Sequence, residues 1–131
     1  ERVGDLARNI ASCAHRLAER EPTPASTTLR QLADDSTRAL SRSLQAFADL
    51  DVDLARAVLA EDDKIDTAEA QAIRESIARI HEDPRISHQE IDMILIAKSL
   101  ERVADHATNI AEEVVLAAES INLKHAGKLA T

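Results

Sequence analysis

Residues 94–114 have the sequence ILIAKSLERVADHATNIAEEV, which contains neither glycine nor proline. Apolar residues recur in it every three or four positions, the spacing that gathers side chains on one face of an α-helix. The pattern extends back to Ile91 and forward to Ile121. We therefore predict an amphipathic helix that begins near Ser87, where Ser87 and Glu90 form a capping box, and ends near Asn122.

The rest of the chain predicts three further amphipathic helices, separated by breaks at Pro22 and Pro84 and by a cap between the second and third. We place them from about Arg2 to Glu19, from Ser26 or Thr27 to Leu50, and from a cap at Asp49 or Asp51 to Ile80. The apolar stripe of the second helix is expected to consist of Leu29, Leu32, Ala33, Leu40, Leu44 and Phe47. Long helices with short connections and one apolar face each predict an all-α fold, an antiparallel bundle of four long helices.

Composition narrows the class of protein. The chain has 131 residues and a formal net charge of −8, with one Phe and neither Trp nor Tyr, so it offers little to neutralise phosphates or stack on bases. Its longest apolar runs fall far short of the ~20 residues that span a bilayer. The single Cys13 gives no disulfide framework, which favours a reducing compartment. We expect a cytoplasmic protein that binds no nucleic acid and does not insert into a membrane.

A repeat divides the chain. Residues 1–11, ERVGDLARNIA, and residues 101–111, ERVADHATNIA, are identical at eight of eleven positions. Such self-similarity indicates a repeat architecture. We predict that residues 1–22 are the last helix of a truncated first repeat, that residues 23–122 form a complete three-helix repeat, and that residues 123–131 are a loosely held C-terminal tail. The apolar side of the first helix then has to bury against the second repeat or against another copy of the chain.

The repeated stretch carries an acidic stripe. On a helix, Glu101, Asp105 and Asn109 fall on one side, away from the apolar residues. Carboxylates four residues apart repel each other, at a cost of a few tenths of a kcal/mol, unless a cation lies between them. Carboxylate and amide oxygens are the ligands that hard divalent cations prefer. The stripe therefore predicts a cation site, with a solvated acidic surface as the alternative.

A second acidic pair lies in the third predicted helix. Asp62 and Asp66 are also four residues apart, Glu69 follows one turn later, and all three overlap the edge of the apolar stripe. A carboxylate at the edge of a core needs a partner. Either an Arg or Lys from a neighbouring helix supplies it, or the acidic helices share a metal ion. His106 adjoins the acidic stripe and is expected to be a surface residue rather than a ligand.

Residues 94–113 resemble a signature of the PhoU family, the bacterial regulators of phosphate uptake, and the similarity extends to Glu82–Arg85 and Leu123–His125. The resemblance covers nearly the whole chain and implies two tandem three-helix repeats. It also implies surface clusters of divalent metal (Fe, Mn, Zn or Mg) on Glu/Asp-x-x-x-Asp motifs. The matching residues are Glu1, Asp5, Asp62, Asp66, Glu101 and Asp105, with Asn9 and Asn109 alongside. Ala104 stands where the family usually has glycine, which Gly4 keeps in the first copy.

The resemblance further implies a negative regulator, or adaptor, of phosphate uptake and of the phosphate-starvation response. It would link the ATPase of the phosphate ABC transporter to a sensor histidine kinase, and it would form homo-oligomers. Two alternatives stay open: a cytosolic control module of a larger transporter or channel, and an adaptor whose acidic surface holds no functional metal.

We predict no enzymatic activity. Di-iron oxidases built on helical bundles use Glu-x-x-His pairs, and no Glu in this chain has a His three residues later. The sequence contains no glycine-rich phosphate loop and no nucleophile motif. Cys13 lies on the apolar side of its helix, where a buried and inert thiol is expected.

Overall fold

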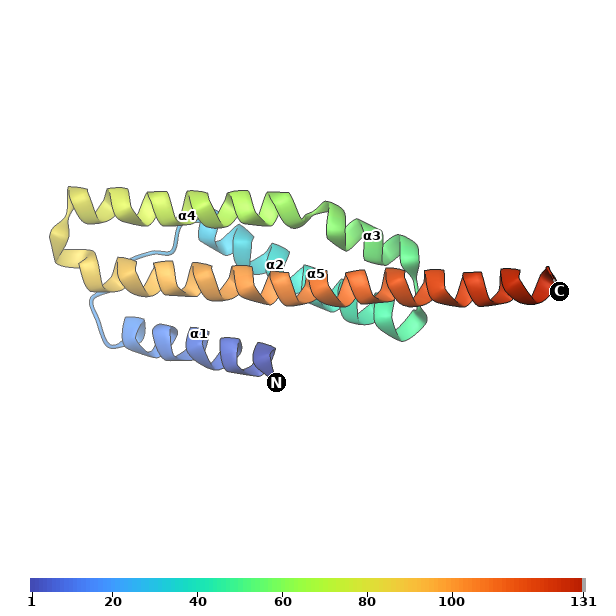
Figure 1. Cartoon of the computed structure of the whole chain (residues 1–131). Helices are drawn as coiled ribbons and strands as arrows, with labels where there is room; N and C mark the ends of the chain where they lie inside the picture. Colours follow the sequence, from blue (N-terminus) through green and yellow to red (C-terminus); the bar gives the residue numbers. More distant parts are fainter. Residues whose placement is uncertain (131) are drawn as a thin grey trace.

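The computed structural model describes residues 1–130, which form five α-helices and one short 3-10 turn (Figure 1). The elements are α1 (Arg2–Ala18), α2 (Thr27–Asp49), α3 (Val52–Ala60), α4 (Asp62–Glu82), η1 (Pro84–Ile86) and α5 (Ser87–Leu129). The described residues include no β-strand. The predicted all-α helical bundle is confirmed.

The longest helix, α5, is the centre of the bundle. It contacts α1, α2, α3 and α4, whereas α1 packs on α5 alone among the helices of residues 1–130. Figure 1 shows α1 along α5 on the side away from α4, with its direction opposite to that of α5. Two different sides of α5 are therefore covered by two different neighbours.

Small side chains dominate the interior of the bundle. Buried alanines and serines line the core face of α2, and α5 meets it with a row of alanines: Ala39, Ser43 and Ala46 from α2, and Ala97, Ala104, Ala107 and Ala111 from α5. Short side chains allow two helix axes to approach closely. The predicted stripe of α2 is wrong at its end, because Leu44 and Phe47 are 51% and 66% exposed while Ala46 faces the core.

The third predicted helix is divided in two at Glu61. The Glu61 amide donates to the Val58 carbonyl at 3.2 Å, a bond of the 3-10 type that tightens the turn before α4 begins. Asp51 caps α3 by accepting from the Leu54 amide at 3.0 Å, and Ser26 caps α2 by accepting from Leu29 at 3.0 Å. Both caps agree with the sequence prediction, but the uninterrupted helix does not.

The start of α5 differs from the predicted capping box. Ser87 lies inside the helix, and its hydroxyl donates to the Pro84 carbonyl. Glu90 is fully buried and accepts from Arg79 Nε at 2.9 Å and from Nη2 at 3.2 Å. Burying the carboxylate against an arginine of α4 gives Glu90 a stronger partner than the backbone amide of a helix start.

The end of α5 also differs from the prediction. The helix continues past Asn122 to Leu129, although residues 121–130 are all exposed. Lys, Leu and Ala are good helix formers, so local propensity extends a helix that nothing in the described residues covers. Thr131, the end of the predicted tail, lies outside the described residues. Among residues 1–130, no helix has an apolar stretch long enough to cross a bilayer.

Candidate metal centre

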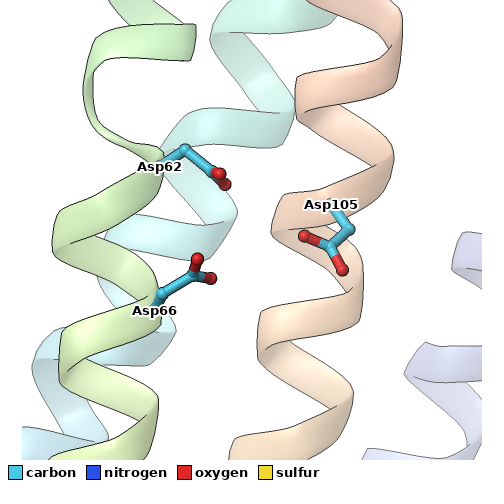
Figure 2. A group of neighbouring side chains, drawn as sticks. All are labelled: Asp62, Asp66 and Asp105. Carbon is cyan, nitrogen blue, oxygen red and sulfur yellow. The ribbon is translucent and has the colours of Figure 1, made fainter.

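Three aspartates from two helices meet between α4 and α5. Asp62 opens α4, where the helix dipole favours negative charge, and Asp66 follows one turn later. Asp105 projects from the middle of α5, and Figure 2 shows all three carboxylates in the space between the two helices. One carboxylate oxygen from each residue lies within 4.8 Å of the others. The fold has brought together two acidic motifs that are separate in the sequence.

Glu101 joins this group from α5, one turn before Asp105. Burial raises the pKa of the Glu101 carboxyl from 4.5 to about 8, and its hydrogen bond to Asp105 and the charges of Asp105, Glu69 and Asp66 add to the effect. At neutral pH, without a cation, this carboxyl is therefore largely protonated and donates to its acidic neighbour. We call Asp62, Asp66, Glu69, Glu101 and Asp105 the acidic cluster.

The other members of the acidic cluster are perturbed in the same direction. Burial raises the pKa of Asp66, and the charges of Asp62, Asp105 and Asp63 raise it further, against a hydrogen bond with Glu101 that lowers it. Burial likewise raises the pKa of Glu69, and the Lys98 ammonium partly offsets this. These raised carboxyl pKa values reflect partial burial and mutual repulsion, both of which a bound cation would offset.

The acidic cluster lacks protein counter-ions in direct contact. Within residues 1–130, none of its five carboxylates forms a salt bridge with Arg or Lys. The nearby Lys64 pairs instead with the buried Asp35, 3.6 Å away on α2. The Thr108 hydroxyl, a neutral group, donates to Asp62 Oδ1 at 3.2 Å. Among residues 1–130, Asp62 and Asp66 therefore have no Arg or Lys partner in direct contact, whereas Glu69 has Lys98 of α5 as a nearby charge.

The donor set fits a hard divalent cation. The acidic cluster offers carboxylate oxygens only, from two helices. Those of Asp62, Asp66 and Asp105 are at separations that one ion can bridge after small side-chain movements. All-oxygen ligation suits Mg²⁺ and Mn²⁺, and the Irving–Williams order adds Fe²⁺ and Zn²⁺ when those ions are available. The identity of the metal stays a prediction. So does the role of Asn109 as a ligand; it lies one turn beyond Asp105 and is exposed on α5.

The first copy of the motif is in different surroundings. Glu1, Asp5 and Asn9 are all exposed, and α1 packs on the side of α5 away from α4. Asp5 lines a shallow pocket with Arg102 and His106. Among residues 1–130, Asp62, Asp66 and Asp105 are the only group of three acidic, His or Cys side chains spaced for one metal ion. Glu1 and Asp5 thus belong to no such group among the described residues.

Ala104 does not obstruct the acidic cluster. Its side chain is 2% exposed and belongs to the hydrophobic core, so the methyl group that replaces the family's usual glycine is buried there, whereas Asp105 is exposed. Sequence reasoning overlooked Thr108, whose position three residues after Asp105 is the signal that places it on the same side of α5.

The match to a family model decides the classification. A model described as "PhoU domain" matches residues 29–114, which include α3, α4 and the acidic cluster. The chain belongs to the PhoU domain family. The resemblance seen in the sequence is confirmed.

Individual relatives agree with this assignment. The chain is 34% identical to a "Phosphate-specific transport system accessory protein PhoU homolog" of Pseudomonas aeruginosa over 97% of its own length and 53% of that protein. A PhoU homolog 1 of Thermotoga maritima is 35% identical over 95% of the chain and 54% of the relative. The crystal structure of PhoU from Pseudomonas aeruginosa superposes with a TM-score of 0.86 at 35% identity, covering 92% of this chain and 58% of that one. The chain thus spans about half the length of the PhoU proteins it matches.

Proposed function

We propose that this PhoU domain is part of a non-catalytic, cytoplasmic accessory protein of phosphate uptake. It restrains the phosphate transporter and the phosphate-starvation response, and it links the ATPase of a phosphate ABC transporter to a sensor histidine kinase. The named relatives are accessory proteins of the phosphate-specific transport system, which supports this role over a control module fused to a channel.

The observation that carries the proposal is the acidic cluster between α4 and α5. Asp62, Asp66, Glu101 and Asp105 would hold a divalent metal ion, which would supply the positive charge that their crowding demands. Without a cation, Glu101 keeps a proton, and the other carboxylates of α4 and α5 still repel each other. With the repulsion relieved, α4 and α5 present a fixed surface to a partner, so partner binding depends on the cation.

A pull-down tests the proposal. The chain is immobilised and offered the purified ATPase subunit of a phosphate transporter and the cytoplasmic part of a phosphate-responsive sensor kinase, with Mn²⁺ or with a chelator. We expect both partners to be retained with Mn²⁺ and retention to fall with chelator or in the Asp66→Asn/Asp105→Asn variant. The Glu1→Gln/Asp5→Asn variant is the matched control, since it removes the same charges from the first copy. Retention of neither partner by the chain with Mn²⁺ contradicts the proposal.

A further inference from the structure

A second face of α5 carries the opposite charge. Lys98, Arg102 and His106 are spaced by four residues and so form one row along the helix. This row lies on the side that α1 covers, because Lys98 and Arg102 line one pocket between the two helices and Arg102 and His106 line another. Asp105 lies on the neighbouring side of α5 and faces Asp62 and Asp66 of α4 (Figure 2). The basic row borders the acidic cluster, since Lys98 and Arg102 also line a pocket with Glu69 and Glu101.

The first of these pockets has an unusual composition for this protein. Its volume is about 320 Å³, and three of its lining side chains are cations: Arg16, Lys98 and Arg102. The described residues that line it include no Asp or Glu, although acidic residues outnumber Lys and Arg by 24 to 16 in the chain. The lining of this pocket is therefore positively charged, although the chain as a whole is negatively charged.

The cationic side chains of the pocket have hydrogen-bond donors that the contacts described below do not use. Within residues 1–130, Arg102 forms no salt bridge, and Lys98 acts only as a nearby charge on Glu69. Arg16 is fixed by Asp92, which accepts from Nε at 3.0 Å and from Nη2 at 2.6 Å. These contacts leave Nη1 of Arg16 for another acceptor, and Asp92 holds the guanidinium in place.

The neutral lining residues complete a site for an oxyanion. Asn9 and Ser12 from α1 and Ser99 from α5 add one amide and two hydroxyl groups to the three cations. Arginine forks and hydroxyl donors are the groups that proteins use to bind phosphate. A volume of about 320 Å³ is at the lower end of the roughly 300–1,000 Å³ of small-molecule sites, which favours a small anion over a nucleotide.

We propose that the groove between α1 and α5, lined by Arg16, Lys98 and Arg102, binds a small phosphate-type oxyanion. The shared chemistry is a tetrahedral phosphate group, which can come from inorganic phosphate or from a small phosphate monoester. The choice of phosphate among oxyanions rests on the proposed function. The groove borders the acidic cluster, because Lys98 and Arg102 also line a pocket with Glu69 and Glu101. A phosphate bound there would bridge α1 to α5, so the packing of the first-copy helix would respond to phosphate.

Calorimetric titration tests this proposal. The chain is stripped of metal with a chelator, so that phosphate cannot bind through an ion at the acidic cluster, and ionic strength is held constant with chloride. Inorganic phosphate and glycerol 3-phosphate are titrated separately. We expect saturable binding, with inorganic phosphate preferred if the free ion is the source and glycerol 3-phosphate preferred if a metabolite is the source.

Two variants and a control locate the binding. Arg102→Gln and Lys98→Gln change exposed side chains, so both are expected to fold, and each should weaken binding about tenfold or more. Arg56→Gln removes the same charge from the exposed face of α3, away from the groove, and should leave the affinity unchanged. Absence of saturable binding of either phosphate compound, or equal affinity in Arg102→Gln and the parent, would overturn the proposal. The pull-down of the transporter ATPase and the kinase with and without metal tests the proposed function independently of this titration.

Discussion

The two copies of the repeated motif, residues 1–11 and 101–111, share most of their sequence but have different surroundings. In α5 the acidic stripe meets Asp62 and Asp66 of α4, and burial, with the neighbouring carboxylates adding to it, raises the pKa of Glu101 to about 8. In α1 the same positions, Glu1 and Asp5, are exposed and belong to no group of three possible metal ligands within residues 1–130. The motif is therefore half of a site, and the helix packed against it supplies the other half.

The largest effect is expected from separating α4 from α5. Arg79→Ala leaves the fully buried Glu90 carboxylate without its partner, and removing one member of a buried pair costs about 3 kcal/mol of unfolding free energy. Because the pair joins the two helices that carry the acidic cluster, cation affinity should fall as well. Urea unfolding measures the first effect and Mn²⁺ titration the second.

Arg74→Ala is the control for this experiment. Arg74 is exposed on the same helix and bonds only to Gln71 in the described residues, so its loss should change stability by no more than about 0.5 kcal/mol. Equal destabilisation by the two substitutions would show that the buried pair does not join the helices.

A smaller effect is expected from releasing α1. Arg16→Ala removes the charged hydrogen bonds that tie α1 to the buried Asp92 of α5, at a cost of about 1–3 kcal/mol. Hydrogen exchange should speed up in α1, while Mn²⁺ affinity at the acidic cluster stays at the parental level. A loss of Mn²⁺ binding comparable to that in Arg79→Ala would mean that the two faces of α5 are coupled.

The smallest effect is a dependence of stability on pH. In the metal-free protein Glu101 keeps a proton that the unfolded chain releases, because its pKa rises from 4.5 to about 8 on folding. The free energy of unfolding should therefore fall as pH rises from about 4.5 to 8, by on the order of 1 kcal/mol, since partial solvation screens the cluster. Added Mn²⁺ should reverse the loss near pH 8.

Glu101→Gln should flatten this pH profile in thermal unfolding of the metal-free chain. Glu1→Gln, at the equivalent position of the first copy, is the matched comparison and should leave the profile as in the parent, because Glu1 is exposed outside the acidic cluster. A profile that is unchanged in Glu101→Gln would assign the pH dependence to another group.

The fold was predictable where one local rule governed it. Apolar periodicity located the helices, and short polar side chains located the caps at Ser26 and Asp51. Tertiary contacts overrode the local rules elsewhere: Glu90 pairs with Arg79 instead of capping α5, and Ala46 takes the core position that Leu44 and Phe47 were expected to share. The break at Glu61, which sets Asp62 at the start of α4, carried no proline or glycine as a signal.

The candidate site was predictable in part for the same reason. Spacing identified the acids on each helix, because the helical period alone places Asp62 with Asp66 and Glu101 with Asp105. Which acidic pairs meet depends on how the helices pack, and here α4 reaches the second copy of the motif while the first copy faces Arg102 and His106. The raised pKa of Glu101 is a property of that packing and has no signal in the sequence.

Metal content is the most direct test of the central claim that a cation site forms where the second copy meets α4, and not at the first copy. The chain, the Asp66→Asn/Asp105→Asn variant and the Glu1→Gln/Asp5→Asn variant are soaked with Mn²⁺, Fe²⁺ or Zn²⁺, desalted and weighed by native mass spectrometry. We predict stoichiometric metal in the parent and in the Glu1→Gln/Asp5→Asn variant, and loss of metal in the Asp66→Asn/Asp105→Asn variant. Equal metal in both variants, or no metal in the parent with any of the three ions, would contradict the account.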